Sequence, residues 1–380
     1  SMRYKKILYT FLGILISICF TLLFLEIVLN FFPVNEGLRS QAVNEKNPIF
    51  RFEANREAIY SKNWNFDIKN KVKVNNYGFV NNNDYDNTNE IPLLSIIGDS
   101  YVEALMVPFE QTISGLLQNE VSNKRVYSFA ASGAGLSQHL IWAKYAKEEF
   151  KSNYFIFVII ANDFMESLSK YGSSPGFHRF KINSDNSWNM ELARYTPSNL
   201  RKILRRSKLA MYLITNLRVH SIFNFELRLG KEDQRKRYVS NFDAEVSDIF
   251  WEEAKLVTDI YLDNMNSFTG QENNKILFVL DGIRPNLYGK VSSVDISNSF
   301  WYKIREYFMD KASAHGFEFI DMQKDFSYEY KKNKELFEFK TDSHWNHVGH
   351  KVVSQSILQS NTWKSFLIKI DNINIYEYIH

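Results

Sequence analysis

The residues of this chain that could carry out chemistry follow hydrophobic stretches. Residues 93–97 are apolar except for Ser95 and lead into Gly98, Asp99 and Ser100, after which a helical pattern begins. Open α/β sheets bind ligands at the carboxyl ends of their strands, so a serine hydroxyl placed there is a candidate nucleophile. Gly, Asp and Ser are also common turn residues. The triplet therefore needs a general base and an oxyanion site from elsewhere in the chain.

Two further stretches end in groups that could stabilise an oxyanion. The strand-like residues 125–130 are followed by Gly133, and a glycine there lets the backbone turn and point an N–H inward. The apolar residues 154–160 lead to Asn162, whose amide could donate to the same oxyanion. Both have ordinary structural explanations. Gly133 suits a tight strand-to-helix connection, and Asn162 with Asp163 suits a helix cap.

A histidine-rich segment near the C-terminus offers the general base. Histidine is the usual base for serine, and a nearby carboxylate fixes its tautomer. Asp342 and His344 have the types required, and His347 and His350 follow. The spacing of these three histidines matches no common zinc arrangement, and the chain has a single cysteine, so we expect no metal and no cofactor.

Alternating strands and helices must position these groups. We expect strands at 93–97, 125–130, 154–160, 275–280 and 317–320, and helices at 111–120, 137–150, 245–268, 300–314 and 351–358. This alternation predicts an α/β fold with a doubly wound parallel sheet. The fully apolar run 154–160 is typical of a sheet covered on both faces.

The first 33 residues predict a membrane anchor. Residues 7–25 contain no charge and are long enough to cross a hydrocarbon core. Arg3, Lys5 and Lys6 precede them, so the positive-inside rule leaves the N-terminus in the cytoplasm and the rest outside. A cleaved signal peptide would have a shorter apolar core and a cleavage site of small residues, whereas bulky residues fill 25–33. A buried core helix is the remaining alternative.

The rest of the chain divides by composition. Residues 34–90 are polar and form a lead-in or stalk, 91–360 form the catalytic domain, and 361–380 form a tail. Residues 164–243 break the alternation and predict a helical insertion, in which 201–237 hold eleven Lys/Arg against three acidic residues. Such a basic amphipathic segment suits a membrane surface, an anionic polymer or the solvated face of a lid. The net charge of +3 indicates no nucleic-acid partner.

In chain order these pieces resemble the blocks of the SGNH (GDSL) hydrolase superfamily, over about residues 76 to 358. Residues 75–79 and 344–350 are similar to membrane-anchored bacterial members. The resemblance implies a flavodoxin-like, five-stranded parallel sheet with Ser100 as the nucleophile. It also implies an oxyanion hole made by the Ser100 N–H, Gly133 and Asn162, with Asp342 and His344 completing the triad.

The chain departs from the family pattern at two points. Ile160 stands where the family has the glycine of Gly-x-Asn-Asp, and the usual Asp-x-x-His is shortened to Asp342-Ser343-His344. The shorter form resembles extracytoplasmic glycan O-acetyltransferase relatives. We expect Asp99 to be a structural hydrogen-bonding partner, and the two later histidines to be structural or peripheral.

The resemblance implies an extracytoplasmic, serine-dependent acyl-ester hydrolase or O-acetyltransferase acting on cell-envelope carbohydrate. Both activities share an acyl-enzyme on Ser100 and differ in the acceptor, which is water or a sugar hydroxyl. The expected partners are an acylated glycan or other ester, the membrane, and, for a transferase, a separate membrane protein that supplies acyl groups. Two alternatives stay open: a lipase-like esterase that docks on lipid, and a non-catalytic envelope scaffold.

Overall fold

The computed structural model describes residues 2–219, 246–289 and 293–377. These residues fall into two compact units, which are described separately. The first contains the described residues 2–39, 57–72 and 197–219, and the second contains 40–56, 73–196, 246–289 and 293–377. Residues 220–237 of the predicted basic segment lie outside the described residues.

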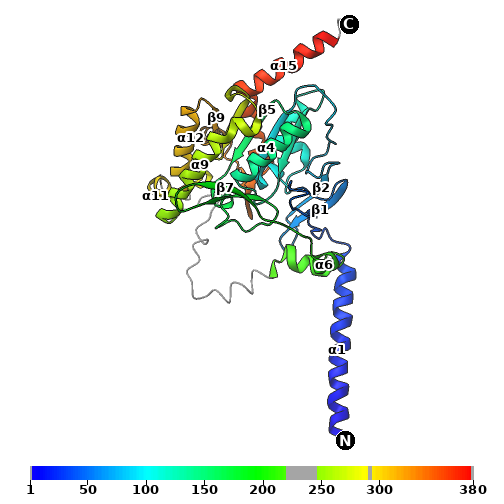
Figure 1. Ribbon diagram of the computed structural model, residues 1–380. Coiled ribbons are helices and arrows are strands. Elements are labelled where there is room, and N and C mark those ends of the chain that lie inside the picture. Colours follow the sequence, from blue (N-terminus) through cyan, green and yellow to red (C-terminus); the bar gives the residue numbers. More distant parts are fainter. Residues whose placement is uncertain (1, 220–245, 290–292, 378–380) are drawn as a thin grey trace. The chain divides into compact units, whose positions relative to one another are not determined.

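Within the described part of the second unit, five parallel strands form the central sheet (Figure 1). Their order in space is β4-β3-β5-β8-β9. The strands are β3 (Leu94–Gly98), β4 (Val126–Ala130), β5 (Tyr154–Ile159), β8 (Ile276–Leu280) and β9 (Glu318–Asp321). Numbered along the chain, this order is 2-1-3-4-5, the flavodoxin-like arrangement. The predicted fold class, a doubly wound parallel sheet, is confirmed.

Helices cover both faces of this sheet, as a buried parallel sheet requires. One face packs against α3 (Ile113–Asn119), α13 (Met322–Asn333), α14 (His347–Gln359) and α15 (Asn361–Glu377). The other face packs against α4 (Leu136–Phe150), α9 (Asp248–Thr269) and α12 (Phe300–Ala314). On that second face, Phe278 of β8 has its ring centroid 5.9 Å from that of Tyr261 and 5.2 Å from that of Phe308. Alternate residues of each strand therefore point to opposite faces of the sheet, and each face forms a core with the helices that cover it.

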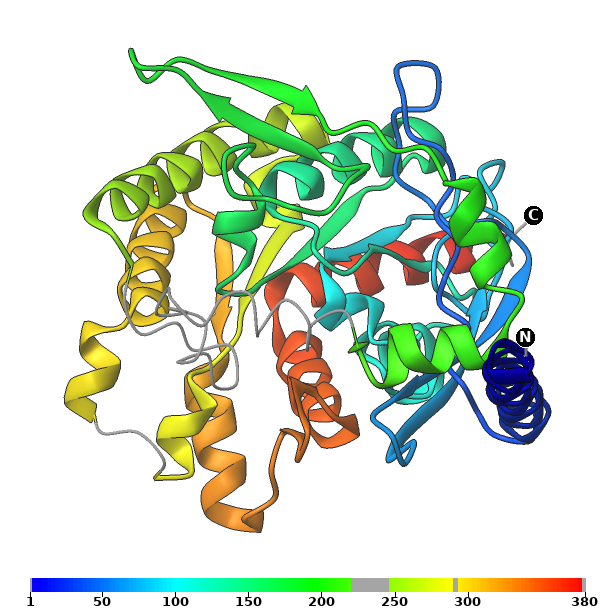
Figure 2. The same cartoon turned by 90° about the horizontal axis from the view of Figure 1, so that it is seen from below.

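Short elements occupy the connections. These are α2 (Ser100–Glu103), η1 (Phe109–Gln111), α5 (Asp163–Glu166), η4 (Asn273–Lys275), α10 (Arg284–Leu287), α11 (Ser293–Asn298), and the hairpins β6 (His178–Ile182) with β7 (Trp188–Leu192) and β10 (Glu338–Phe339) with β11 (Asp342–Trp345). The hairpin β6–β7 extends from the body of the unit (Figure 2) and falls within the predicted helical insertion, where the sequence analysis had not indicated strands. The predicted tail is helical, since α15 extends to residue 377.

The first unit contains α1 (Met2–Leu29), the hairpin β1 (Arg56–Lys62) with β2 (Ile68–Val74), α6 (Asn199–Leu204), α7 (Lys208–Met211) and η2 (Tyr212–Asn216). Among the described residues, α1 is the one helix long and apolar enough to cross a membrane, over Tyr4–Leu29 with a mean hydropathy of 2.6. Its apolar side chains are exposed rather than packed in a core. This exposure fits the predicted single-pass anchor better than a buried core helix.

Part of the polar lead-in packs tightly against the sheet of the second unit. Tyr85 is buried, and its ring stacks on that of Tyr127 with centroids 4.0 Å apart. Its hydroxyl donates to the carbonyl of Ser128 at 2.7 Å and accepts from the N–H of Ser128 at 2.9 Å. Ser128 lies on β4, which is an edge strand of the sheet. A tyrosine hydroxyl therefore satisfies backbone groups that an edge strand would otherwise leave unpaired.

Replacing this hydroxyl is expected to destabilise the sheet edge. Tyr85→Phe leaves a buried N–H and a buried carbonyl without this partner, and each such loss costs about 1–3 kcal/mol. We expect the free energy of unfolding of the detergent-solubilised chain, measured in urea, to fall by roughly 2–6 kcal/mol. Tyr328→Phe, at an exposed tyrosine of α13, is the control and should change it little. Equal effects of the two substitutions would show that the lead-in does not support β4.

Candidate active site

The site is built at the carboxyl end of β3, where the chain turns directly into α2. Ser100 is the first residue of α2, and the Asp99 side chain caps the helix by accepting from the N–H of Tyr101 at 2.9 Å. A Cβ on Gly98 would lie 2.4 Å from Cγ2 of Val102, so the helix can approach the strand this closely only over a glycine. The Gly-Asp-Ser triplet thus places a serine side chain at the end of β3, an interior strand of the sheet between β4 and β5.

The structure brings Ser100, His344 and Asp342 together. Nε2 of His344 lies 2.8 Å from Oγ of Ser100. On the other side of the ring, Nδ1 contacts Oδ1 of Asp342, and the same oxygen accepts from the His344 backbone N–H at 2.9 Å. With Nδ1 donating to the carboxylate, the neutral imidazole presents the lone pair of Nε2 to the serine hydroxyl. This arrangement can remove a proton from Ser100.

The shortened Asp-x-His spacing is explained by the strand that carries it. Asp342 and His344 both lie on β11, where residues two apart point to the same side. The side chains of Asp342 and His344 can therefore contact each other without a helical turn between them. Asp342 is buried, whereas the His344 side chain is partly exposed to solvent. The two residues have the geometry of a base and the carboxylate that orients it.

The three predicted oxyanion donors follow adjacent strands of the sheet. Ser100 follows β3, Gly133 follows β4 and Asn162 follows β5. Gly133 has φ +83°, a left-handed conformation that glycine adopts readily. The turn therefore explains why this residue is a glycine, in addition to any role in binding. Asn162 occupies the N-cap position of α5 but makes no side-chain capping bond. Its Nδ2 instead lies 3.4 Å from Oδ2 of Asp99.

The residue that departs from the family pattern, Ile160, faces the core. Its side chain is fully buried in the cluster that includes Val158 of β5. Its N–H donates to Oδ2 of Asp163 at 2.8 Å, so Asp163 holds the turn after β5. Neither residue of this dipeptide makes the side-chain capping bond that the alternative explanation required: Asp163 accepts from a residue before the helix, and the amide of Asn162 donates to Asp99.

Asp99 lies beneath these groups as a buried acceptor. Its Oδ2 is 3.3 Å from the Ser100 hydroxyl, a longer contact than that between Ser100 and His344. Burial raises the pKa of Asp99, although hydrogen bonds from its neighbours and the charge of His344 oppose the change. These contacts agree with the structural role expected for Asp99.

A carboxylate that the sequence analysis did not single out holds the Gly133 loop. Glu103, the last residue of α2, is buried and accepts from the N–H of Ser132 at 3.0 Å and also from its hydroxyl. The helix that carries Ser100 is thereby tied to the loop that carries Gly133. Burial raises the pKa of Glu103 from 4.5 to about 7, and the nearby Asp99 charge adds to the increase. A sequence signal existed, since Glu103 lies three residues after Ser100 on the same short helix.

A buried ion cluster around Arg284 holds the hairpin β10–β11. The guanidinium donates to Glu338 of β10 at 2.8 Å, to Asp281 at 3.1 Å and to the Tyr101 hydroxyl at 2.9 Å. Tyr101 in turn donates to the carbonyl of Ser343, which lies between Asp342 and His344. The same cation is thus connected to the helix that begins at Ser100 and to the hairpin that carries His344.

The other two histidines of the segment are placed differently. His350 is buried, its Nδ1 accepts from the N–H of Ile113 at 3.2 Å, and burial lowers its pKa to about 3. It is therefore a neutral structural residue at ordinary pH. His347 is exposed on the first turn of α14. Over the described ranges, no group of three or more His, Cys, Asp or Glu side chains is arranged to hold a metal ion.

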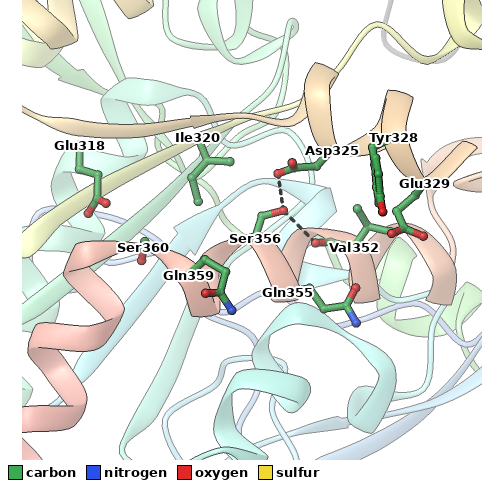
Figure 3. A pocket seen from close by; sticks show the side chains of 10 residues that line it. All are labelled: Glu318, Ile320, Asp325, Tyr328, Glu329, Val352, Gln355, Ser356, Gln359 and Ser360. Carbon is green, nitrogen blue, oxygen red and sulfur yellow. Dashed lines mark hydrogen bonds between the residues drawn. The ribbon is translucent and has the colours of Figure 1, made fainter. Parts of the chain in front are cut away.

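A pocket of about 420 Å³ lies away from these residues (Figure 3). It is lined by side chains of β9, α13 and α14, among them Glu318, Tyr328 and Gln355. Its Ser356 hydroxyl donates to Asp325 and to the carbonyl of Val352, as the dashed lines show. None of its lining residues is a predicted site residue, and we assign it no part in the chemistry.

Comparison with known proteins gives structural neighbours at low identity. No family model matches the chain, and no curated protein matches it. Solved structures similar to it include LAE5, an alpha/beta hydrolase enzyme from the metagenome of Lake Arreo, Spain, with 15% identity, a TM-score of 0.38, and coverage of 72% of this chain and 95% of that one. A member of the lipolytic G-D-S-L family from Veillonella parvula has 10% identity, a TM-score of 0.37, and coverage of 70% and 96%. The acetyl xylan esterase AlAXEase has 11% identity, a TM-score of 0.36, and coverage of 70% and 98%.

The raised pKa of Glu103 predicts a specific dependence of stability on pH. The folded protein keeps this proton to higher pH than the unfolded chain, so the stabilisation is fully present below pH 4.5 and is lost as the pH rises through about 7. The loss amounts to roughly 3 kcal/mol. The amide side chain of the Glu103→Gln variant cannot ionise, so this variant should lack the pH-dependent contribution to the free energy of unfolding. We therefore expect the difference in unfolding free energy, wild type minus variant, to fall by that amount between pH 4.5 and 7.5.

Urea unfolding over this pH range measures the difference, because the other carboxyl groups are common to both proteins. Glu335→Gln, at an exposed position, is the control and should give a curve parallel to that of the wild type. A Glu103→Gln curve that is also parallel would contradict the buried position of this carboxyl group.

Proposed function

We propose that this protein is an extracytoplasmic, serine-dependent acyl-ester hydrolase or O-acetyltransferase of SGNH type. The observation that carries the proposal is the alignment of Ser100 Oγ, the His344 ring and Asp342. The 2.8 Å contact joins serine and base, and the carboxylate lies on the opposite ring nitrogen. Nucleophile, base and orienting group in this order are the elements of covalent acyl transfer.

In the first half-reaction, Oγ of Ser100 attacks the carbonyl carbon of an acyl ester while Nε2 of His344 takes the hydroxyl proton. The carbonyl oxygen becomes an oxyanion, which the N–H groups of Ser100 and Gly133 and the amide of Asn162 stabilise. The imidazolium, stabilised by Asp342, then gives its proton to the leaving alcohol oxygen. The bond from the acyl carbon to that oxygen breaks, and an acyl-enzyme on Ser100 remains.

The second half-reaction repeats these steps with a different hydroxyl group. His344 takes a proton from the acceptor, whose oxygen attacks the acyl carbon, and then returns the proton to Ser100. Water as the acceptor gives hydrolysis, and a sugar hydroxyl gives O-acyl transfer. The residues named here serve both outcomes equally, so the acceptor decides between hydrolase and transferase.

The proposed location rests on α1 and the charges that flank it. Arg3, Lys5 and Lys6 at the start of the helix favour a cytoplasmic N-terminus, which leaves the second unit outside. We propose cell-envelope carbohydrate as the substrate because the Asp-x-His spacing resembles that of extracytoplasmic glycan O-acetyltransferase relatives. A transferase in this position would receive acyl groups from a separate membrane partner.

Removal of either central residue is expected to abolish acyl transfer. Ser100→Ala and His344→Ala should each lower kcat for an acetyl ester by about 10³-fold or more, because nucleophile and base act as a unit. Both variants should also lose labelling by a fluorophosphonate probe. His347→Ala, at an exposed histidine three residues from His344, is the matched control and should retain turnover and labelling. Labelling that survives Ser100→Ala, or turnover that survives His344→Ala, would refute the assignment, and an unlabelled wild type would favour a scaffold.

Loss of the Asn162 amide should affect the transition state selectively. Asn162→Ala removes one oxyanion donor, and we expect kcat to fall by about 10²–10³-fold with KM little changed. Asn186→Ala, at a turn residue between β6 and β7, is the control and should keep the wild-type kcat. A large rise in KM with unchanged kcat would instead assign Asn162 to uniform substrate binding.

The acceptor can be identified from the products. The full chain in detergent is incubated with an acetyl ester, with and without an acetylatable glycan. Acetate release that the glycan does not affect indicates a hydrolase, whereas acetate transferred to the glycan indicates a transferase. We expect turnover of acetyl esters in either case. A preference for long acyl chains without acetyl-ester turnover would favour the lipase-like alternative.

A further inference from the structure

We propose that the first unit binds the headgroup region of an anionic lipid bilayer through an interfacial collar. The collar comprises residues 198–216 together with Phe31 and Trp64. This inference rests on the proposed membrane-spanning role of α1, which is part of the proposed function. It is independent of the catalytic roles assigned to Ser100 and His344.

Glu26 sets the depth of the collar in the membrane. It directly follows the charge-free residues 7–25, which extend about 28 Å as a helix and nearly match a hydrocarbon core of roughly 30 Å. Its carboxylate accepts from the Ser207 hydroxyl at 2.7 Å and from the N–H groups of Lys208 at 2.8 Å and Leu209 at 2.9 Å. The start of α7 is therefore fixed at the level where the hydrocarbon ends.

Apolar and aromatic packing also stabilises the contact between α7 and α1. Leu29 of α1 forms a small buried cluster with Val34 and with Met211 of α7. The ring of Phe66 lies between those of Phe32 and Tyr212, with centroid distances of 5.8 and 5.6 Å. In Figure 1, α6 lies at the level of the C-terminal end of α1, and α7, which follows α6, contacts α1. The collar is thus oriented along a bilayer that α1 crosses.

The collar exposes large apolar side chains. Leu200 and Ile203, one turn apart on α6, are 65% and 63% exposed, and Leu213 and Ile214 of η2 are also exposed. Trp64 is 71% exposed, and the Tyr212 hydroxyl donates to its carbonyl at 2.9 Å. Aromatic and aliphatic side chains exposed at this depth match the interfacial belt of membrane proteins.

The charge of the collar favours anionic lipid over neutral lipid. Residues 198–216 contain five Lys/Arg and no Asp or Glu. Two of the five brace the unit, since Arg205 donates to the carbonyl of Leu38 and Lys208 pairs with Glu36 at 2.9 Å. Arg201, Lys202 and Arg206 are exposed beside the apolar side chains. Basic side chains flanking an apolar face are typical of helices that bind anionic membrane surfaces.

The test places a fluorophore on the collar of the full chain. Cys19, the only cysteine, is replaced by serine, and Ile203→Cys is labelled with an environment-sensitive dye. The protein is reconstituted into protein-free vesicles of phosphatidylcholine, with or without phosphatidylglycerol. We expect the label to be quenched by lipids that carry a shallow nitroxide, and more strongly when phosphatidylglycerol is present. Tyr328→Cys, labelled in the same way on exposed α13, is the control and should remain accessible to an aqueous quencher.

Charge reversal tests the anionic part of the proposal. Arg201→Glu, Lys202→Glu and Arg206→Glu should each reduce the ratio of membrane-bound to free label on phosphatidylglycerol vesicles, on the order of fivefold per charge. Lys331→Glu and Lys332→Glu on α13 are the matched controls and should have no effect.

Two results would overturn the proposal. The first is a collar label that stays in water in both kinds of vesicle, which would indicate that the collar binds a protein or polymer instead of lipid. The second is quenching that changes neither with the charge of the lipid nor with charge reversal of the collar. Ester turnover is measured in the same vesicles, and Ser100→Ala should keep the collar response. Loss of the collar response with turnover retained would therefore refute this inference and leave the catalytic proposal intact.

Discussion

The geometry of the site depends on the buried ion cluster formed by the guanidinium of Arg284. Full burial of a cation is costly unless carboxylates compensate for lost hydration, and here Asp281 and Glu338 both do so. Glu338 belongs to β10, so this ion pair fixes the position of the hairpin whose second strand carries Asp342 and His344. Buried ion pairs often contribute little net stability, and their best attested use is to select one arrangement. The Arg284 cluster serves this purpose at the carboxyl end of the sheet.

From this constraint the rest of the site follows. The Tyr101 hydroxyl, which accepts from Arg284 and donates to the Ser343 carbonyl, connects the helix after Ser100 with the strand of His344. Glu103 connects the same helix with the Gly133 loop. Two buried contacts on one short helix thus connect Ser100 with the strand of His344 and with the Gly133 loop. Such support is what keeps reacting groups within a few tenths of an ångström of a productive geometry.

Much of the sheet could be predicted from the sequence because its strands are buried on both faces. The apolar run 154–160 needs no long-range information to be recognised as a central strand, and Gly98-Asp99-Ser100 marks the end of another. The supporting residues could not be found in this way. Arg284 and Tyr101 lie 183 positions apart, and nothing in either local sequence indicates the other. The hairpin β6–β7 was also missed, because its mixed polar and aromatic residues resemble the surrounding insertion.

The central claim is that Ser100 carries the acyl group between donor and acceptor. Rapid acid quench of the wild-type chain during acetyl-ester turnover, followed by peptide mass spectrometry, tests it most directly. We expect an acetyl group on the peptide that contains Ser100, formed before steady state and absent from Ser100→Ala. Turnover of the ester with an acetyl group on a different residue, or with no acyl-enzyme and undiminished activity in Ser100→Ala, would contradict it.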